Sequence, residues 1–147
     1  MTLSIPFRSI QHVFFDDLDA LNILHNVRFV LFMERARGEF LNSLGFGWKD
    51  DLATNPDKYH VVAEHQIRYI ASVRSDGNLV VEVTPRHIGR SSFIIYAEVR
   101  AMHGPTIFAE GTTRLVRLDP TTNKPCSWSD RFRNVITPLI ISETKPA

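Results

Sequence analysis

The sequence predicts an α+β domain in which one long helix packs against an antiparallel sheet of five strands. Two observations favour this fold class. One stretch near the amino end has the residue spacing of an amphipathic helix, and four later stretches alternate apolar and polar residues between short turns. Strands that alternate and follow one another closely pair antiparallel, and a helix can then cover one face of their sheet.

The composition indicates a single globular domain over residues 1–147. Hydrophobic residues make up 44% of the chain and charged residues 22%, and no repeat or linker marks a domain boundary. The formal net charge of +1 gives no broad field that would attract a polyanion. We therefore expect no nucleic acid as a partner.

Cysteine content and hydropathy suggest where the protein works. Cys126 is the only cysteine, so no disulfide can form within the chain, which agrees with a reducing compartment. The opening segment lacks a signal-peptide core, and no stretch approaches the roughly 18 apolar residues that span a bilayer. We expect a cytoplasmic protein without a membrane span.

Residues 7–15 alternate and predict a first strand, and the long helix follows. Its apolar positions recur at steps of three and four residues. Asn26 is a good N-cap residue, and Gly45 follows the stripe as a C-terminal cap. Arg35 and Glu39 have the spacing of an exposed ion pair. The apolar stripe consists of Phe29, Met33, Ala36, Phe40 and Leu44.

The rest of the chain predicts a loop and four strands. Residues 46–60 predict a loop, and strands are expected over 60–69, 78–88, 91–102 and 106–119 because each alternates and is rich in β-branched or aromatic residues. One helix cannot cover both faces of this sheet. Aliphatic residues remain on the second face, so we expect self-association. Examples are Val80, Ile94, Val116 and Leu118.

Three carboxylates, on Asp16, Asp17 and Asp19, lie just before the helix and allow three interpretations. Asp accepts backbone N–H bonds readily, so the cluster could be a simple turn. A calcium loop fails, because Asn22 and Arg28 occupy the positions where an EF-hand needs glycine and glutamate. The third interpretation is a carboxylate beside a helix N-terminus, where free N–H groups can bind a polarised carbonyl oxygen.

The segment from Asp17 to Arg37, DLDALNILHNVRFVLFMERAR, resembles the signature of hotdog-fold acyl-CoA thioesterases of the hydroxybenzoyl-CoA thioesterase type. This family includes the bacterial Tol-Pal-associated branch. The resemblance continues more loosely through GRSSF at residues 89–93 and AEGTTRLVRLD at residues 109–119, and covers about four-fifths of the chain. It implies the hotdog fold, in which one long central helix is wrapped by a five-stranded antiparallel sheet.

The resemblance also implies roles for residues. Asp19, the second Asp of the D-x-D motif, corresponds to the catalytic carboxylate, and the backbone N–H of Asn26 binds the thioester carbonyl. Amide dipoles would stabilise the developing oxyanion while Asp19 either activates water or attacks the carbonyl itself. The sequence does not choose between these routes. Asp17 is then a structural partner.

The chain departs from the Tol-Pal-associated branch at two positions. Phe15 stands where that branch has a tyrosine, four residues before the aspartate, and Asn26 stands where it has a histidine. His25 lies one position earlier than that histidine, and a loop rearrangement could bring its imidazole to the site. We therefore include His25 among the candidate catalytic residues and Phe15 among those that contact substrate.

The resemblance suggests that Arg90, Ser91 and Ser92 lie near the pantetheine or the phosphates of CoA, although a polar strand start facing water explains them equally well. Beyond CoA as part of the substrate, we expect no cofactor. We also expect no metal, because none of the six histidines is spaced as in a zinc site. Glu34 could in principle act as a base, but an ion pair with an arginine at a subunit contact suits it better.

The sequence therefore predicts a thioester hydrolase that converts an acyl- or aroyl-CoA to the free acid and CoA. Its active sites are expected at a homodimer interface, within a dimer or a tetramer built from two dimers. Two alternatives remain. The domain could be a non-catalytic hotdog module that binds acyl thioesters or a protein partner. It could also be a hotdog hydratase or dehydratase, although this sequence lacks the Asp/His pair that we would expect for moving water across a double bond.

Overall fold

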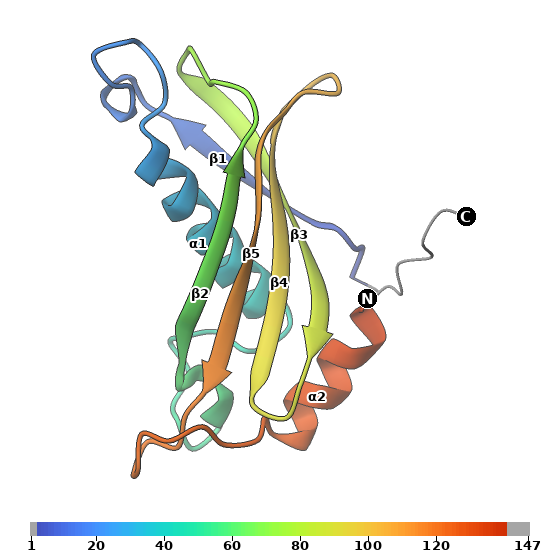
Figure 1. Ribbon diagram of the computed structural model, residues 1–147. Coiled ribbons are helices and arrows are strands. Elements are labelled where there is room, and N and C mark those ends of the chain that lie inside the picture. Colours follow the sequence, from blue (N-terminus) through green and yellow to red (C-terminus); the bar gives the residue numbers. More distant parts are fainter. Residues whose placement is uncertain (1–2, 141–147) are drawn as a thin grey trace.

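The computed structural model describes residues 3–140 and confirms the predicted α+β architecture. Five antiparallel strands form one sheet in the order β1-β3-β4-β5-β2, and the long helix α1 lies along one of its faces (Figure 1). This is the hotdog arrangement that the resemblance implied. The strands are β1 (Phe7–Val13), β2 (His60–Tyr69), β3 (Gly77–Ile88), β4 (Ser92–Ala101) and β5 (Ile107–Arg117).

Helix α1 (Asn26–Ser43) packs mainly on β1 and β3 and meets β2 through few side-chain contacts, such as that of Phe29 with Tyr69. Its buried face includes Phe32, Ala36 and Phe40, which meet Val83 and Phe93 of the sheet in one apolar core. Burial of such side chains stabilises the fold by about 1.5 to 3 kcal/mol each. Because α1 lies towards one side of the sheet, the opposite edge strand remains open.

The ends of α1 differ slightly from the sequence prediction. The prediction that Asn26 is the N-cap was wrong by one residue, because His25 holds that position and Asn26 is already helical. Gly45 does follow the helix in a left-handed conformation, with a φ of 85°, which glycine adopts without strain. Arg35 and Glu39 form no ion pair within residues 3–140. Instead Glu34 holds Arg37 through two hydrogen bonds of 2.7 Å.

Strand β2 was predicted to be half-buried, and this was wrong for the single chain. Its residues are exposed along most of its length, including Val61, Val62 and Tyr69. The physical reason is its place at the edge of the sheet, where α1 makes few contacts. An edge strand with exposed apolar residues has an unpaired row of backbone groups that another strand can join.

The sheet face opposite α1 carries a connected row of polar side chains. Tyr96 donates a hydrogen bond to Glu98 at 2.9 Å or to Glu110 at 2.8 Å, and Arg68 and Arg100 pair with these two carboxylates. Burial, followed by these hydrogen bonds, raises the pKa of the Tyr96 hydroxyl far above its usual range. The same contact with Tyr96 lowers the pKa of Glu110. Self-association through this face stays a prediction.

A short helix near the end of the described chain, α2 (Asp130–Ile136), was not predicted. Two 3-10 turns lie in connecting segments, η1 (Phe15–Asp17) and η2 (Pro56–Lys58), and a third, η3 (Thr137–Leu139), follows α2. Ser129 caps α2 by accepting the N–H of Phe132, and its own N–H and hydroxyl donate to the buried Asp57. The side chains of Trp128 and Phe132 stack at 4.4 Å between centroids. These contacts close the end of the sheet where β2 and β4 begin.

Candidate active site

The loop between β1 and α1 folds back on itself as a narrow hairpin. The N–H of His25 donates to the Asp17 carbonyl at 3.0 Å, and the N–H of Asp19 donates to the Ile23 carbonyl at 2.8 Å. Asn22 adopts a φ of 61° near the tip, a conformation that asparagine tolerates better than most residues. The hairpin therefore carries the chain from Asp19 directly back to the first turn of α1.

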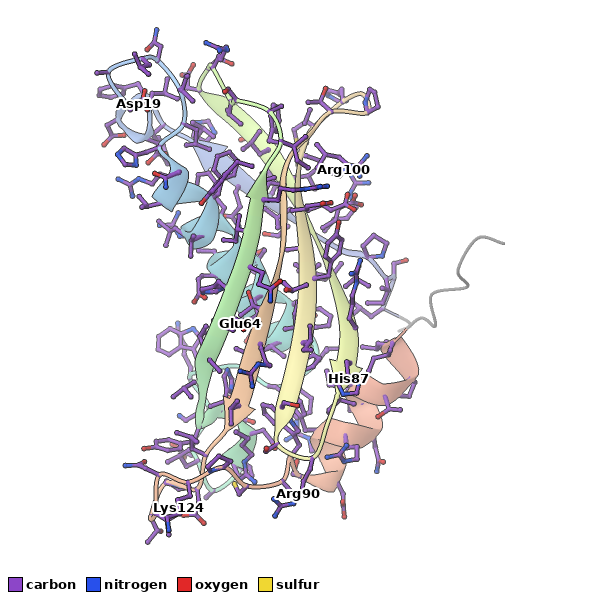
Figure 2. All side chains as sticks on the ribbon, in the orientation of Figure 1. Asp19, Glu64, His87, Arg90, Arg100 and Lys124 are labelled. Atoms are coloured by element: carbon purple, nitrogen blue, oxygen red, sulfur yellow. The ribbon has the colours of Figure 1, made fainter. Side chains whose placement is uncertain are left out.

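The Asp19 carboxylate is half-buried on this hairpin, at the end of the molecule where α1 begins (Figure 2). Its Oδ1 atom accepts the N–H groups of Leu21 at 2.8 Å and Ile23 at 3.2 Å. Within residues 3–140, its Oδ2 atom accepts no hydrogen bond. One oxygen thus holds the turn, and the other is available for a ligand or a water molecule.

The N-terminus of α1 lies next to this loop and has no side-chain cap among the described residues. In any α-helix the first N–H groups have no acceptor within the helix, and the helix dipole adds partial positive charge there. His25, the N-cap residue, is exposed and its ring makes no hydrogen bond within residues 3–140. The N–H groups of Asn26 and Val27 can therefore bind a negatively polarised oxygen.

A cleft of about 220 Å³ opens beside the helix start. Asn26 and Phe29 of α1 line it together with Tyr69 at the end of β2. The Tyr69 hydroxyl donates to the Asn26 carbonyl at 3.3 Å, and its ring packs 5.5 Å from that of Phe29. Asp19 does not line this cleft in the single chain. The structure brings Asn26 to the cleft and Asp19 to the neighbouring loop.

Asp17 supports the loop, as the sequence predicted. Its side chain is nearly buried, and its two oxygens make different contacts. Oδ2 accepts the N–H of Phe14 at 2.8 Å, and Oδ1 lies 3.2 Å from Nε of Arg28. Because Arg28 belongs to the first turns of α1, this ion pair ties the acidic loop to the helix.

Phe15 lies on the same loop and is 82% exposed. Phe14, Leu21 and Val27 are also largely exposed around the helix start. An apolar cluster of this kind on a monomer commonly marks a contact with a ligand or a partner. The predicted substrate contact of Phe15 is consistent with this exposure and stays a prediction.

The predicted CoA-binding residues lie at the other end of the molecule. Figure 2 shows Arg90 and Asp19 at opposite ends of the sheet. Backbone bonds tie this turn to the last part of the described chain, since the carbonyl of Arg90 accepts the N–H of Trp128 and that of Ser91 accepts the N–H of Arg117. Arg90, Ser91 and Ser92 can therefore approach a helix start only in a second copy of the chain.

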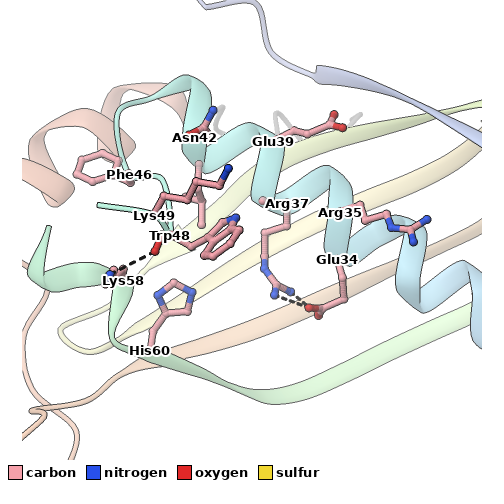
Figure 3. Close-up of a pocket in the computed structure, with 12 residues that line it drawn as sticks. Glu34, Arg35, Arg37, Glu39, Asn42, Phe46, Trp48, Lys49, Lys58 and His60 are labelled. Atoms are coloured by element: carbon pink, nitrogen blue, oxygen red, sulfur yellow. Dashed lines mark hydrogen bonds and ion pairs between the residues drawn. The ribbon is translucent and has the colours of Figure 1, made fainter. Parts of the chain in front are cut away.

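A larger cleft, of about 820 Å³, lies between the second half of α1 and the start of β2 (Figure 3). Glu34 and Arg37 line it on the helix side, and Trp48 and His60 on the other. We did not predict this cleft, because residues 46–60 were interpreted only as a loop. Trp48 was the available signal, since a tryptophan is unusual among the charged residues of an exposed loop.

The described residues contain no group of three or more His, Cys, Asp or Glu side chains that could hold a metal ion. None of the helices within residues 3–140 is long and apolar enough to cross a membrane.

A family model described as the thioesterase superfamily matches residues 21–108, which include the helix start, all of α1 and three strands. The chain is 26% identical over 125 residues to the acyl-CoA thioesterase YbgC of Haemophilus influenzae, covering 85% of this chain and 87% of that protein.

Solved structures give the same fold. The chain is 27% identical to a thioesterase from Thermus thermophilus whose crystal structure contains coenzyme A and zinc, with a TM-score of 0.75 over 97% of this chain and 98% of that one. A 1,4-dihydroxy-2-naphthoyl-CoA thioesterase from Synechocystis superposes with a TM-score of 0.76 over 95% and 98% of the two chains. Its 15% identity makes it evidence for the fold alone.

Proposed function

The chain belongs to the thioesterase superfamily, and we propose that this thioester hydrolase converts an acyl- or aroyl-CoA to the free acid and CoA. The observation that carries the proposal is the position of Asp19 on a hairpin that returns to the uncapped start of α1. Of its carboxylate oxygens, Oδ1 accepts hydrogen bonds from the loop, and Oδ2 accepts none within residues 3–140. The similarity to an acyl-CoA thioesterase and to a thioesterase that binds coenzyme A supports CoA as the leaving group.

In the proposed reaction the thioester carbonyl oxygen accepts the N–H of Asn26. This contact strengthens as negative charge develops on the oxygen, so it lowers the barrier. In one route Asp19 takes a proton from water, whose oxygen attacks the carbonyl carbon, and the carbon–sulfur bond breaks as the tetrahedral intermediate collapses to the acid. In the other route Asp19 attacks the carbonyl carbon itself, the carbon–sulfur bond breaks as the mixed anhydride forms, and water then hydrolyses the anhydride. In both routes CoA leaves as a thiolate that takes up a proton.

His25 and Phe15 complete the proposed site. His25 is the residue immediately before the carbonyl-binding N–H, so its imidazole can reach the reacting group after a small movement of the loop. Phe15 lies on the adjoining turn and can cover the acyl or pantetheine chain with apolar surface. Both residues would help to exclude water from the reaction site once substrate is bound.

We further propose that two copies form the functional unit. Strand β2 has an open edge, exposed apolar residues and a cleft at each of its two ends. Antiparallel pairing of β2 with a second β2 would continue the sheet and would carry the Arg90 turn of one copy towards the helix start of the other. A tetramer built from two such dimers is also compatible.

The single cysteine fits a reducing compartment, so we propose a cytoplasmic location.

A panel of acyl-CoA substrates with detection of the released thiol tests this function. We expect turnover with at least one short, long or aromatic acyl group. Binding without thiol release across the panel would contradict the enzyme proposal and favour a non-catalytic module. Consumption of an enoyl-CoA without thiol release would favour a hydratase instead.

A further inference from the structure

The hairpin of residues 17–25, which carries Asp19, is held to the rest of the molecule at its base. Leu24 is 2% exposed there, and its N–H donates to the Val73 carbonyl at 2.8 Å. Leu21, near the tip, is 74% exposed. Figure 2 shows this hairpin at one end of the molecule, beyond the first turn of α1. The position of Asp19 relative to α1 therefore depends on the contacts at the base.

Asp17 joins three segments at this base. Its Oδ2 atom accepts the N–H of Phe14 at 2.8 Å, just after β1 has ended. Its carbonyl oxygen accepts the N–H of His25 at 3.0 Å, where the hairpin returns to the helix. Its Oδ1 atom lies 3.2 Å from Nε of Arg28, in the first turn of α1. Asp17 thus connects the end of β1, the hairpin and α1.

Arg28 balances the charge of Asp17 at a place that water hardly reaches. The side chain of Asp17 is 11% exposed, and that of Arg28 is 40% exposed. A carboxylate with so little access to water is costly to bury unless a cation or hydrogen-bond donors compensate it. Without Arg28, the N–H of Phe14 would be the one partner left to this carboxylate among residues 3–140, and the base would have to open to admit water. We expect that opening to displace the hairpin.

A displacement at Asp17 would reach Asp19 through the hairpin itself. Only Leu18 separates the two aspartates, and Leu18 forms an antiparallel β-bridge with Leu24. The N–H of Asp19 also donates to the Ile23 carbonyl at 2.8 Å, so the two arms of the hairpin move together. Misplacement of a reacting group by about 1 Å can cost up to about a hundredfold in rate. The ion pair can therefore control the rate of the reaction without contact with the substrate.

We propose that Arg28 is a positioning residue, which acts through Asp17 to hold the Asp19 carboxylate against the carbonyl bound at the start of α1. This inference rests on the proposed thioesterase function and adds a residue that controls the turnover rate. It gives the two aspartates of the D-x-D motif different tasks, since Asp19 is the reacting group and the Asp17–Arg28 pair fixes its position. Loss of the pair should lower kcat and leave KM nearly unchanged, because the pair acts on Asp19 and not on the bound substrate.

Arg28→Met tests this role, because it removes the charge and keeps an unbranched side chain. We expect kcat to fall at least about tenfold, while KM changes by less than about threefold. Arg28→Lys restores a cation and should regain most of the lost kcat. Arg35→Met, at an exposed arginine of the same helix, is the matched control and should keep the wild-type kcat. An Arg28→Met variant with the wild-type kcat, or with a raised KM as its only change, would overturn the proposal.

A double-mutant cycle tests whether Arg28 acts through Asp17. Asp17→Asn removes the negative charge and keeps an oxygen that can accept the N–H of Phe14. If the two residues act as a unit, the loss of kcat in the double variant Asp17→Asn/Arg28→Met should exceed the larger single loss by no more than about twofold. Losses that multiply would mean that Arg28 and Asp17 act independently, which would contradict the proposal.

Amide hydrogen exchange, measured by NMR, separates failure of this inference from failure of the enzyme assignment. The N–H groups of Asp19 and His25 make the two hydrogen bonds that join the arms of the hairpin. We expect both groups to exchange at least about fivefold faster in Arg28→Met than in the wild type, and at the wild-type rate in Arg35→Met. Unchanged exchange at both amides in Arg28→Met would overturn the proposal. If the hairpin loosens as expected but the wild type hydrolyses no thioester, the hold of Arg28 on the hairpin stands and only the enzyme assignment fails.

Discussion

The two ends of α1 differ in how completely the chain satisfies them. At the carboxyl end, the N–H groups of Gly45 and Phe46 return to Asn42 and Leu41, and Arg131 of α2 donates to the Gly45 carbonyl at 2.9 Å. At the amino end no side chain of the described residues caps the helix, and exposed apolar residues surround it. The closed end stabilises the fold, and the open end retains the groups that a substrate can use.

The strongest test of the open end is Asp19→Asn. If Asp19 is the base or the nucleophile, kcat should fall at least about a hundredfold, or roughly 2.7 kcal/mol in barrier height. The amide oxygen can still accept the N–H groups of Leu21 and Ile23, so the loop should stay folded. Steady-state kinetics and circular dichroism measure the two effects.

Asp16→Asn is the matched control for this variant. Asp16 is exposed on the same loop, and its side chain makes no hydrogen bond or ion pair within residues 3–140. We expect its kcat to stay within about twofold of the wild type. Equal losses for the two variants would show that loop charge matters rather than the position of Asp19.

The closed end should respond in stability rather than in rate. Asp57→Ala removes the acceptor of two hydrogen bonds from Ser129, of 2.8 and 2.5 Å, and the partner of Arg117 at 3.8 Å. The free energy of unfolding should fall by about 2 kcal/mol, because the partly buried donors of Ser129 are left without a partner. Urea denaturation measures this loss. Asp51→Ala, at an exposed aspartate of the same loop, should change it little, and equal losses would argue against the buried contact.

A smaller effect is expected for Ser129→Ala. The hydroxyl of Ser129 accepts the N–H of Phe132 at 3.1 Å, which caps α2, and donates one hydrogen bond to Asp57. Loss of an N-cap costs about 1 kcal/mol of stability. Thermal unfolding should show a lower Tm than in Ser127→Ala, whose side chain is exposed. Unchanged Tm values in both variants would mean that α2 contributes little to the fold.

The smallest expected effect is the pH dependence caused by His60. Its pKa is lower in the folded chain than in the unfolded chain, chiefly because of burial. The unfolded state therefore binds the proton first, and stability falls as pH decreases through the unfolded value of 6.5 towards the lower folded value. Between these two pKa values, the free energy of unfolding should decrease more steeply with falling pH in the wild type than in His60→Gln. An equal decrease in both proteins would contradict the lowered pKa of His60.

The periodicity of the sequence was sufficient for most of the fold. The apolar stripe of α1 and the alternation of the strands predicted their positions closely, because burial on one face is the force that orders both. α2 was missed, since a helix of seven residues has too few turns to show a period. The exposure of β2 was also missed, because alternation cannot distinguish an exposed edge strand from a covered strand.

The candidate site was only partly predictable. Asp19 and Asn26 could be named from the motif, and the hairpin at Asn22 explains how the chain brings them close. The larger cleft was not predictable, since Trp48 and His60 come together only when residues 46–60 fold against α1. The protonation of His60 depends on one carbonyl, that of Asp57, which no sequence pattern identifies.

A crystal structure with a non-hydrolysable acyl-CoA analogue tests the central claim most directly. We predict that the carbonyl oxygen of the analogue lies within hydrogen-bond distance, about 2.7 to 3.2 Å, of the Asn26 nitrogen, with the Asp19 carboxylate facing its carbonyl carbon. A carbonyl bound away from the start of α1, with Asp19 still directed only at its own loop, would contradict it.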